Sequence, residues 1–487
     1  MKKAYRKALF WICFVLFAVT TPLAVFYSQG YRFDAYKKIF VHSGSITVKS
    51  TPSGINVFID GKQQKTGSLD IINNSITING LRPGNYNLRL TAEGYNDWEK
   101  NIEVHSGVST EFWNVFLVPQ NADPQVLKTQ SVERYFVSPS SDKLVYVAKR
   151  PKGSDIELYD LKKDENVQLF SDENTSFSDD ELENAEWNNK EKLILNPVFR
   201  NEKKDFLILD ADQNADPLFL SQIAPPYNPD KARWSPQKEK DVYFTSGLDE
   251  GNLKNLYLAS LDLKNITLIS EKIRAFDISS NHIYFLKENN ILYKTDLAGS
   301  GEEQVTSSSF PIRDAGGSDC RMIVYDDDRQ AIITGDENLV VHNNGKENFT
   351  EVVTEGAKGI QFSDDGKKLL FWGGNEISVM FLRDWDVQPR RKENEVQQIV
   401  RFSSPIANVF WYRDYEHVFF ANTGKVKIID LDSRDHRICS DVLDYNSEKF
   451  LSSYDSVNGI FFYVDEKDNQ RNIFHFAVPE KTGFFTR

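Results

Sequence analysis

Residues 360–382 read IQFSDDGKKLLFWGGNEISVMFL, and the pattern of this stretch indicates the fold of most of the chain. It holds three short apolar runs, separated by the turn signals Ser-Asp-Asp-Gly and Gly-Gly-Asn. Runs of four to eight apolar or aromatic residues between turn signals are typical of β-strands, whereas helices need longer periodic segments. The stretch therefore predicts a tight antiparallel meander.

The same order of runs and turns recurs between residues 120 and 487. Clear copies begin at Tyr135, Ala232, Ala275, Ile360 and Val409, and weaker copies begin at Ala185, Cys320 and Gly459. Successive copies lie about 40–50 residues apart, which is the period of propeller blades of four strands. We therefore predict an all-β chain with an eight-bladed β-propeller over residues 120–487. Seven blades are the alternative, because the weak copies do not define clearly where one repeat ends and the next begins.

The last copy lacks a fourth strand, and a strand-like run, PQVLKTQ, stands unused at residues 124–130. Pairing the two would close the ring and remove its exposed edges. The copies resemble the WD-like repeats in the periplasmic propeller of the bacterial Tol system and in some peptidase propellers, most closely at FSDDGKKLLFW. This resemblance implies an architecture and carries no ligand with it.

Residues 44–119 show a second pattern, a series of strand-sized runs broken by turn residues. One run, INVFID, ends at Asp60-Gly61, a pair that favours a two-residue hairpin turn. The alternation predicts one buried face, formed by Ile46, Val48, Val57, Ile59, Leu88 and Leu90. The segment therefore predicts a small antiparallel β-sandwich.

Several short motifs of this segment resemble the PEGA domain. They are Ser50-Thr51-Pro52, Ile59-Asp60-Gly61, Leu81 with Pro83-Gly84, and Gly94-Tyr95. The resemblance implies a β-sandwich of prokaryotic surface and envelope proteins, which binds envelope polymers or proteins or serves as a spacer, and it brings no catalytic residue. Pro52-Ser53-Gly54-Ile55 replaces the tetrapeptide that gives the family its name. If exposed, Tyr95, Trp98 and Trp113 could stack on sugars, although strand tryptophans are more often core residues.

Residues 8–27 contain no charged side chain and are long enough to cross a bilayer core of about 30 Å as a helix. Lys2, Lys3, Arg6 and Lys7 precede this run and favour a cytoplasmic N-terminus. We expect a cytoplasmic tail at 1–7, a transmembrane helix at 8–27, a linker at 28–43, and the remaining chain outside the cytoplasmic membrane. A cleaved signal sequence is the alternative, disfavoured by the length of the run and the lack of an Ala-x-Ala site.

Charge and thiols exclude some functions. With 58 Lys and Arg against 71 Asp and Glu, the net charge of −13 argues against nucleic acid as a partner. The chain has three cysteines and no Cys-x-x-Cys spacing, so neither a disulfide framework nor a zinc site is expected. Cys320 and Cys439 are predicted to be buried free thiols, with a disulfide between them as the alternative.

No catalytic constellation is recognisable. The seven histidines, His42, His105, His282, His342, His417, His436 and His475, are scattered, and no nucleophile elbow or phosphate-binding glycine loop occurs. The acidic runs at Asp326–Asp328 and Ser178–Asp180 lack the spacing of a calcium loop, so we interpret them as solvated turns. Because few residues follow the last repeat, we expect no catalytic domain after it.

The sequence thus predicts no catalytic, cofactor-binding or metal-binding residue and no cofactor. It predicts a membrane-anchored binding or scaffold protein of the cell envelope, whose partner is an unidentified envelope protein or glycan. A propeller-based hydrolase or lyase acting on envelope polymer is the alternative.

Overall fold

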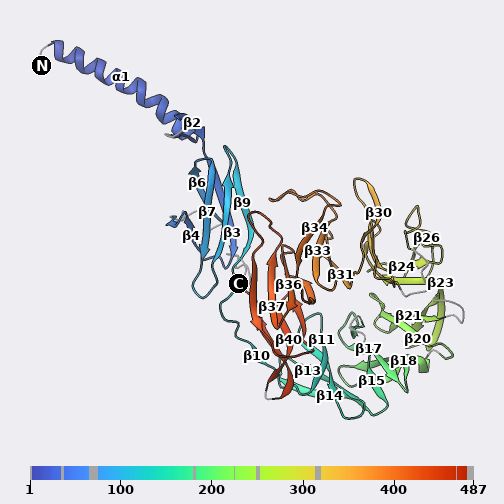
Figure 1. Cartoon of the computed structure of the whole chain (residues 1–487). Coiled ribbons are helices and arrows are strands. Elements are labelled where there is room, and N and C mark those ends of the chain that lie inside the picture. Colours follow the sequence, from blue (N-terminus) through green and yellow to red (C-terminus); the bar gives the residue numbers. More distant parts are fainter. Residues whose placement is uncertain are drawn as a thin grey trace.

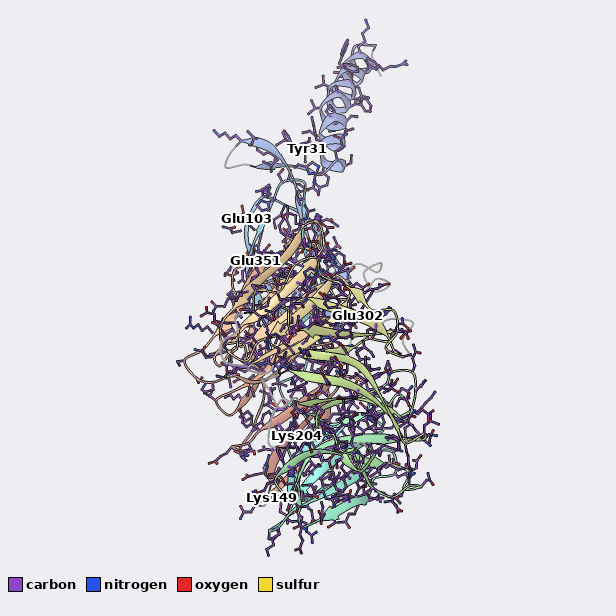
Figure 2. All side chains as sticks on the ribbon, turned by 90° about the vertical axis from the view of Figure 1, so that its right-hand side faces the viewer. Tyr31, Glu103, Lys149, Lys204, Glu302 and Glu351 are labelled. Carbon is purple, nitrogen blue, oxygen red and sulfur yellow. The ribbon has the colours of Figure 1, made fainter. Side chains whose placement is uncertain are left out.

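The computed structural model describes residues 3–34, 38–64, 75–178, 183–223, 225–247, 253–312, 320–467 and 469–479. Figure 1 shows a projecting helix, a small group of strands at its base, and a larger set of sheets around a common centre. In Figure 2, Lys149 and Lys204 mark the end of the molecule farthest from the helix. The chain is therefore elongated, with the small strand group between the helix and the larger sheets.

Helix α1 (Lys3–Ser28) is apolar along most of its length and packs against no core. The apolar part, Tyr5–Ser28, is long enough to cross a membrane, as an anchor or as a signal sequence near the N-terminus. Pro22 lies inside the helix without ending it. The helix begins at Lys3 and not at the predicted residue 8, and the basic residues at 6 and 7 lie in its first turns.

Strands β1 (Tyr31–Asp34) and β2 (Ile39–His42) form an antiparallel hairpin directly after the helix. This hairpin lies within residues 28–43, which the sequence predicted to be a linker. Its alternation is too short to stand out, and its strands pair with each other rather than with another sheet.

The next strands form two facing sheets. One sheet has the order β6-β3-β9, and the other β5-β4-β7-β8. Their bounds are β3 (Gly44–Thr51), β4 (Asn56–Ile59), β5 (Lys62–Gln63), β6 (Ser75–Leu81), β7 (Gly84–Thr91), β8 (Trp98–Val104) and β9 (Ser109–Phe116). Strands β3 and β9 run parallel, while the other pairs are antiparallel.

The core of this sandwich confirms the predicted alternation. Ile46, Val48, Val57, Ile59, Leu88 and Leu90 are all buried between the two sheets. Asp60 and Gly61 have φ angles of 47° and 74°, and Ile59 pairs with Lys62 across them. Positive φ at both central residues is the geometry of a two-residue hairpin turn, so this prediction is also confirmed.

The larger sheets follow in chain order. The first strands are β10 (Gln125–Val126), β11 (Val132–Val137), β12 (Lys143–Lys149), β13 (Ser154–Asp160), β14 (Glu165–Asp172), β15 (Thr175–Phe177), β16 (Glu186–Trp187), β17 (Leu193–Arg200), β18 (Lys203–Asp210), β19 (Leu218–Phe219), β20 (Pro229–Trp234), β21 (Asp241–Gly247), β22 (Lys254–Ser260) and β23 (Asn265–Ile278). A single helical turn, α3 (Leu220–Ile223), follows β19.

The second half of the ring holds β24 (His282–Lys287), β25 (Leu292–Asp296), β26 (Glu303–Gln304), β27 (Arg321–Asp326), β28 (Arg329–Ile333), β29 (Leu339–Asn344), β30 (Asn348–Thr354), β31 (Gly359–Phe362), β32 (Lys368–Trp372), β33 (Glu376–Phe381), β34 (Val396–Arg401), β35 (Ala407–Trp411), β36 (His417–Asn422), β37 (Lys425–Asp430), β38 (Cys439–Asp444), β39 (Leu451–Asp455), β40 (Ile460–Lys467) and β41 (Gln470–Ala477). Sheets such as β11-β12-β13-β14 and β35-β36-β37-β38 are four-stranded meanders in sequence order, as in a propeller.

Strand β23 joins two such meanders into one sheet of seven strands, β20 to β26. Its first half pairs with β22 and its second half with β24. The two ways of counting blades differ at this strand, since the seven-stranded sheet counts as one unit or as two. The blade number of eight stays a prediction.

The sheets stack face to face, which explains why their central strands are continuous apolar runs. In one cluster Leu195 and Phe206 of one sheet pack against Trp234 and Phe244 of the next. Every residue of β36 is buried, whereas the outer strand β14 is largely exposed. Central strands buried on both faces therefore alternate with outer strands that meet solvent.

The ring closes where the first and last parts of the chain meet. Strand β10 pairs with β41, so the run that the sequence left unused completes the last sheet, as predicted. Leu127 donates its N–H to the Ile473 carbonyl at 2.8 Å, and the Ile473 N–H donates to Thr129 Oγ1 at 3.0 Å. Thr129 is buried, so its hydroxyl is a structural acceptor in this closure.

We expect Thr129→Val to destabilise the propeller, because it leaves the buried N–H of Ile473 without its acceptor. The loss should be about 1–3 kcal/mol in the free energy of unfolding. Urea unfolding of the detergent-solubilised chain measures it, with Thr129→Ser, which keeps the hydroxyl, as the matched control. Equal stability of the Val and Ser variants would contradict the role of the hydroxyl.

Candidate functional site

Side chains on the first strand of one unit accept hydrogen bonds from the backbone of the first strand of the next unit. Glu186 on β16 accepts the N–H of Trp234 on β20 at 3.2 Å, and the Trp234 indole donates to the Glu186 carbonyl at 2.9 Å. Gln361 on β31 and Trp411 on β35 repeat both contacts, at 3.1 and 3.2 Å. The same acceptor role falls to an aspartate and an asparagine elsewhere, in the pairs Asp277 with Val324 and Asn408 with Ser452.

These contacts, which we call the inter-unit latches, place polar side chains on the inner strands of the ring. Two of the latch carboxylates are joined by an arginine, because Arg233 donates to Glu186 at 3.1 Å and to Asp277 at 2.8 Å. Each carboxylate thus neutralises the guanidinium and also accepts a backbone N–H. These groups therefore bond to one another and to the backbone of neighbouring sheets.

A cavity of about 570 Å³ opens between inner strands β11 and β39, beside residues that precede β16 and the start of β35. Its volume lies in the range of sites that hold small molecules or short polymer segments. Hydroxyl and amide groups dominate its polar lining, which comprises Tyr135, Ser138, Ser141, Asn184, Asn408, Ser452, Ser453 and Ser456. We call this hollow the channel cavity.

The wall of the channel cavity is fixed by hydrogen bonds between strands. The Tyr135 hydroxyl lies 2.9 Å from both Ser453 Oγ and the Phe462 carbonyl, and burial raises the pKa of this phenol. Asn408 accepts the Ser452 N–H at 3.0 Å and donates to the Phe450 carbonyl at 3.0 Å. The cavity is therefore pre-formed rather than assembled by a ligand.

Among the described residues of its lining, the channel cavity contains one carboxylate, Asp455, and no histidine. Burial alone would raise the pKa of Asp455, but hydrogen bonds from Ser141, Asn458 and the Val457 backbone outweigh it and lower the pKa. A general acid needs the opposite shift near neutral pH. The Asp455 carboxylate is thus an ionised acceptor that orders the turn after β39.

Arg134 is the cation of the lining. Its guanidinium donates to the Ser178 carbonyl at 3.1 Å and to the Asn184 side chain at 3.4 Å. It also lies over the rings of Phe136 and Phe177, at 5.5 and 5.4 Å. These contacts hold the Arg134 guanidinium against residues of its own wall of the channel cavity.

The acidic run Asp326–Asp328 lies at the turn between β27 and β28, and its carboxylates have different partners. Asp326 pairs with Arg329, Asp327 lies 2.7 Å from Lys294 Nζ, and Asp328 accepts from the Asn344 amide at 3.0 Å. Within the described residues, no three His, Cys, Asp or Glu side chains gather as metal ligands would. Of the second run, Ser178 is described, while Asp179 and Asp180 lie outside the described residues.

The structure brings one histidine near this turn. His342 and the carboxylates of Asp327 and Asp328 line a hollow of about 350 Å³. Burial lowers the pKa of His342, whose Nδ1 lies 2.6 Å from the Thr350 hydroxyl. None of the other histidines is among the described residues that line this hollow. They lie on the β1–β2 hairpin, near the β8–β9 turn, on β24, β36 and β41, and in the loop before β38.

The thiols differ from expectation in one respect. Cys320 is buried as predicted, but Cys439 is exposed on the outermost strand β38, and no disulfide joins them. The sequence around Cys439 reads as a strand, but it does not distinguish an outer strand from a central one.

The sandwich is joined to the propeller by a buried ion pair. Lys100 on β8 has no exposed side-chain surface, and its Nζ lies 3.0 Å from Asp430 Oδ2 at the end of β37. The same Nζ donates to the Asp432 carbonyl at 2.7 Å. Burial raises the pKa of Asp430, against the opposing pull of Lys100 and the nearby His417. Removing either partner would leave the other charge uncompensated in the interior.

Two propeller loops cover the open strand edges of the sandwich at this junction. The N–H of Asn101 on β8 donates to Asp435 at 2.8 Å, and this hydrogen bond lowers the pKa of Asp435. On β9, the N–H of Glu111 donates to Gln388 at 3.2 Å, and the Glu111 carbonyl accepts from Arg434 at 2.8 Å. Backbone groups that would otherwise template pairing with another chain are therefore satisfied.

Aromatic packing completes the junction. Arg434 lies 3.9 Å above the Phe112 ring, and Phe116 packs on Tyr412 and His417 with ring centroids 5.0 and 5.8 Å apart. Burial disfavours protonation of His417, but the carboxylates of Asp414 and Asp430 outweigh it and raise the pKa of the imidazole. The charged groups of both modules therefore balance one another inside the junction.

The aromatic residues considered for sugar stacking have other roles here. Trp98 is buried and packs against Phe112 at 5.3 Å, so an exposed role for it was wrong. Trp113 is half-buried beside the junction and donates its indole N–H to Glu111 at 2.9 Å. Tyr95 is half-buried against the sandwich core. For Trp98 the alternative prediction, that a strand tryptophan belongs to the core, is confirmed.

The role of Lys100 and the presence of the channel cavity were not predicted from the sequence. A signal for Lys100 existed, because it occupies an inward position of β8 between the buried residues Trp98 and Ile102. A charge on the apolar face of a strand indicates a buried partner. Nothing comparable marked the channel cavity, since its serines resemble ordinary turn residues.

We expect Lys100→Met to destabilise the sandwich–propeller junction by about 3–5 kcal/mol, because the Asp430 carboxylate loses its buried counter-ion. Adding Asp430→Asn should recover part of the loss. The readouts are urea unfolding and the rate of protease cleavage between the two modules. Lys62→Met, at an exposed site of β5, is the matched control, and identical behaviour of the two methionine variants would refute the role of the pair.

Comparison with known proteins agrees with these two modules. Residues 43–116 match the PEGA domain. Similar solved structures include the Cps50 (Swd1) β-propeller domain of Myceliophteria thermophila, at 8% identity over 73% of this chain and 99% of that one, with a TM-score of 0.42. A structure of the Dos1 propeller shares 12% identity over 74% and 96%, with a TM-score of 0.48. Oligogalacturonate lyase of Vibrio parahaemolyticus shares 10% identity over 75% and 93%, with a TM-score of 0.40.

Because these TM-scores are low, the propeller assignment rests on the strand order of this chain. No curated protein is similar enough in sequence to count as a match. The chain combines a PEGA domain at residues 43–116 with a β-propeller formed by the sheets that follow it.

Proposed function

We propose that the protein is a membrane-anchored binding protein of the cell envelope, which uses its propeller to hold an envelope protein or glycan outside the cytoplasmic membrane. The PEGA domain and the propeller fold both support a binding or scaffold role. The observation that carries the proposal is the pre-formed channel cavity, rich in hydroxyl and amide groups and framed by inner strands.

The N-terminal segment supports the proposed orientation. Helix α1 is exposed along its apolar length, as an anchor would be before insertion into lipid. The basic residues before the apolar run favour the cytoplasmic side for the N-terminus. The PEGA domain and the propeller then lie on the other side, where envelope polymers and proteins are found.

The chemistry of the channel cavity favours a ligand with many neutral hydrogen-bonding groups. Serine hydroxyls and asparagine amides both donate and accept, so they suit the amides of an extended peptide or the hydroxyls of a sugar chain. Tyr135 is buried in the wall and fixes its shape through the hydrogen bonds of its hydroxyl. The single carboxylate and single arginine of the lining already have partners within the protein.

A hydrolase or lyase is less well supported. His417 lies 2.9 Å from an Asp414 carboxylate oxygen, but it is buried in the junction. Asp327, Asp328 and His342 instead line a hollow. However, Asp327 is bound by Lys294 and by Tyr284 at 2.6 Å, and this pairing lowers the pKa of Asp327 despite its burial. His342 is held by Thr350. These partners favour a structural role for the group.

We expect Ser452→Trp to weaken ligand binding, because an indole side chain on β39 occupies part of the channel cavity. The full chain in lipid nanodiscs is presented to arrays of envelope-derived peptides and glycans, and apparent affinity should fall at least about tenfold, or ~1.4 kcal/mol. Ser300→Trp, at an exposed turn outside the cavity, is the matched control. If the wild type binds a ligand and both variants bind it equally well, the binding site lies outside the channel cavity.

Topology is tested by adding protease to intact spheroplasts that express the full chain. The propeller should be digested, because its exposed loops face the medium, while a cytoplasmic marker protein stays whole. Full protection of the propeller under conditions that digest a known surface protein would overturn the proposed orientation.

A further inference from the structure

The β1–β2 hairpin exposes an apolar surface that the protein itself does not cover. Phe33, Ile39 and Phe40 have 48%, 52% and 46% of their surface exposed, on strands that pair only with each other among the described residues. A two-stranded ribbon of this size has no core of its own and is marginal in water. An exposed, aromatic-rich ribbon therefore indicates a contact surface.

The apolar surface of the hairpin is continuous with that of the helix. Phe33 and Phe40 face each other across the ribbon with ring centroids 5.3 Å apart. Phe40 stacks on Phe26 of α1 at 5.7 Å, and Tyr31 meets the same ring edge-on at 5.6 Å. The apolar helix surface thus passes without interruption onto one face of the ribbon.

Polar contacts fix the hairpin between the helix and the PEGA domain. Arg32 lies 3.7 Å above the ring of Tyr27 and donates to the Tyr27 carbonyl at 2.9 Å. Ser43 donates to the Gly30 carbonyl at 2.7 Å, and Ser106 of the PEGA domain donates to the His42 carbonyl at 3.1 Å. The hairpin is therefore held in place rather than trailing from the helix.

Figure 2 shows the direction in which the hairpin points. With Tyr31 at its base, the ribbon leaves the end of the helix sideways, across the helix axis, above the PEGA domain that carries Glu103. If α1 crosses a bilayer, a ribbon at its end and across its axis lies in the plane of the membrane surface.

We propose that the β1–β2 hairpin is a lipid-binding foot, which lies in the interfacial layer of the bilayer beside the end of α1. Tyr side chains concentrate at this depth, because their rings are apolar with a polar end, and Phe side chains of interfacial segments bury at the boundary with the acyl chains. Arg32 and the exposed Lys38 supply cations that suit lipid phosphates. The inference rests on the anchoring of α1 in a membrane that was proposed above.

A protein partner fits the observations less well. The exposed rings continue a surface that is itself apolar and long enough to span lipid, and they lie where that span ends. A protein bound to the same face would compete with lipid for Phe26 and Tyr27 of the helix. The foot would fix the height and tilt of the PEGA domain, and through the Lys100 junction those of the propeller.

Photo-crosslinking of the full chain in phospholipid vesicles tests the foot. p-Benzoylphenylalanine replaces Phe33 or Phe40, both of which are exposed, so the change should not disturb folding. The same residue at Leu16, in the middle of α1, reports insertion of the helix. The same residue at Phe199, an exposed aromatic on the propeller, is the matched control. Lipid adducts are read by mass spectrometry.

We expect lipid adducts at positions 16, 33 and 40 and none above background at 199. Adducts at 16 with none at 33 and 40, or with protein adducts in their place, would refute the foot and leave the anchor intact. Absence of adducts at 16 would refute the anchor and the foot together. Equal lipid adducts at 199 would also refute a specific foot, because the propeller surface would then contact lipid as well.

Discussion

The ion pair between Lys100 and Asp430 is the contact on which the arrangement of this protein depends. A lysine with no exposed surface is rare, because moving its charge out of water is costly unless a counter-ion and hydrogen bonds replace the water. Asp430 and the Asp432 carbonyl replace it here. The PEGA domain and the propeller are therefore parts of one body, and separating them would expose this charge pair together with two open strand edges.

The ring behind the junction relies on a second kind of contact, the inter-unit latches. A polar side chain on one inner strand accepts a backbone N–H of the next, in Glu186, Asp277, Gln361 and Asn408 alike. Apolar packing between sheets has no direction, so these hydrogen bonds help to set how neighbouring sheets are aligned. The channel cavity lies where the last and first sheets meet, and the latch between Asn408 and Ser452 forms part of its wall. Binding at this place would use a surface that ring closure has already made rigid.

Local signals predicted most of the fold. Alternation gave the buried face of the PEGA domain, and Asp60-Gly61 gave a turn whose φ angles are both positive. Repetition gave the meanders, because each unit must bury its two faces against its neighbours. The blade number did not follow, since β23 runs through two meanders without a turn that separates them.

Contacts between distant segments could not be predicted in the same way. The inward position of Lys100 in β8 indicates a buried partner, but no local pattern identifies Asp430 as that partner, because only the docking of the two modules brings them together. The serines of the channel cavity come from both ends of the propeller, so no local motif contains them. The sequence predicts a linker where the β1–β2 hairpin lies, because strands of four residues carry too little pattern to be distinguished from an extended segment.

Amide hydrogen exchange of the full chain in nanodiscs tests most directly the claim that the two modules are one body. The N–H of Asn101 points from the edge of β8 to Asp435 of the propeller, and the N–H of Glu111 points from β9 to Gln388. Both amides are protected only while the junction is closed, so they should exchange as slowly as the amides of β36 in the propeller core. Exchange of these two amides at the rate of exposed loops, beside slow exchange in β36, would contradict the account.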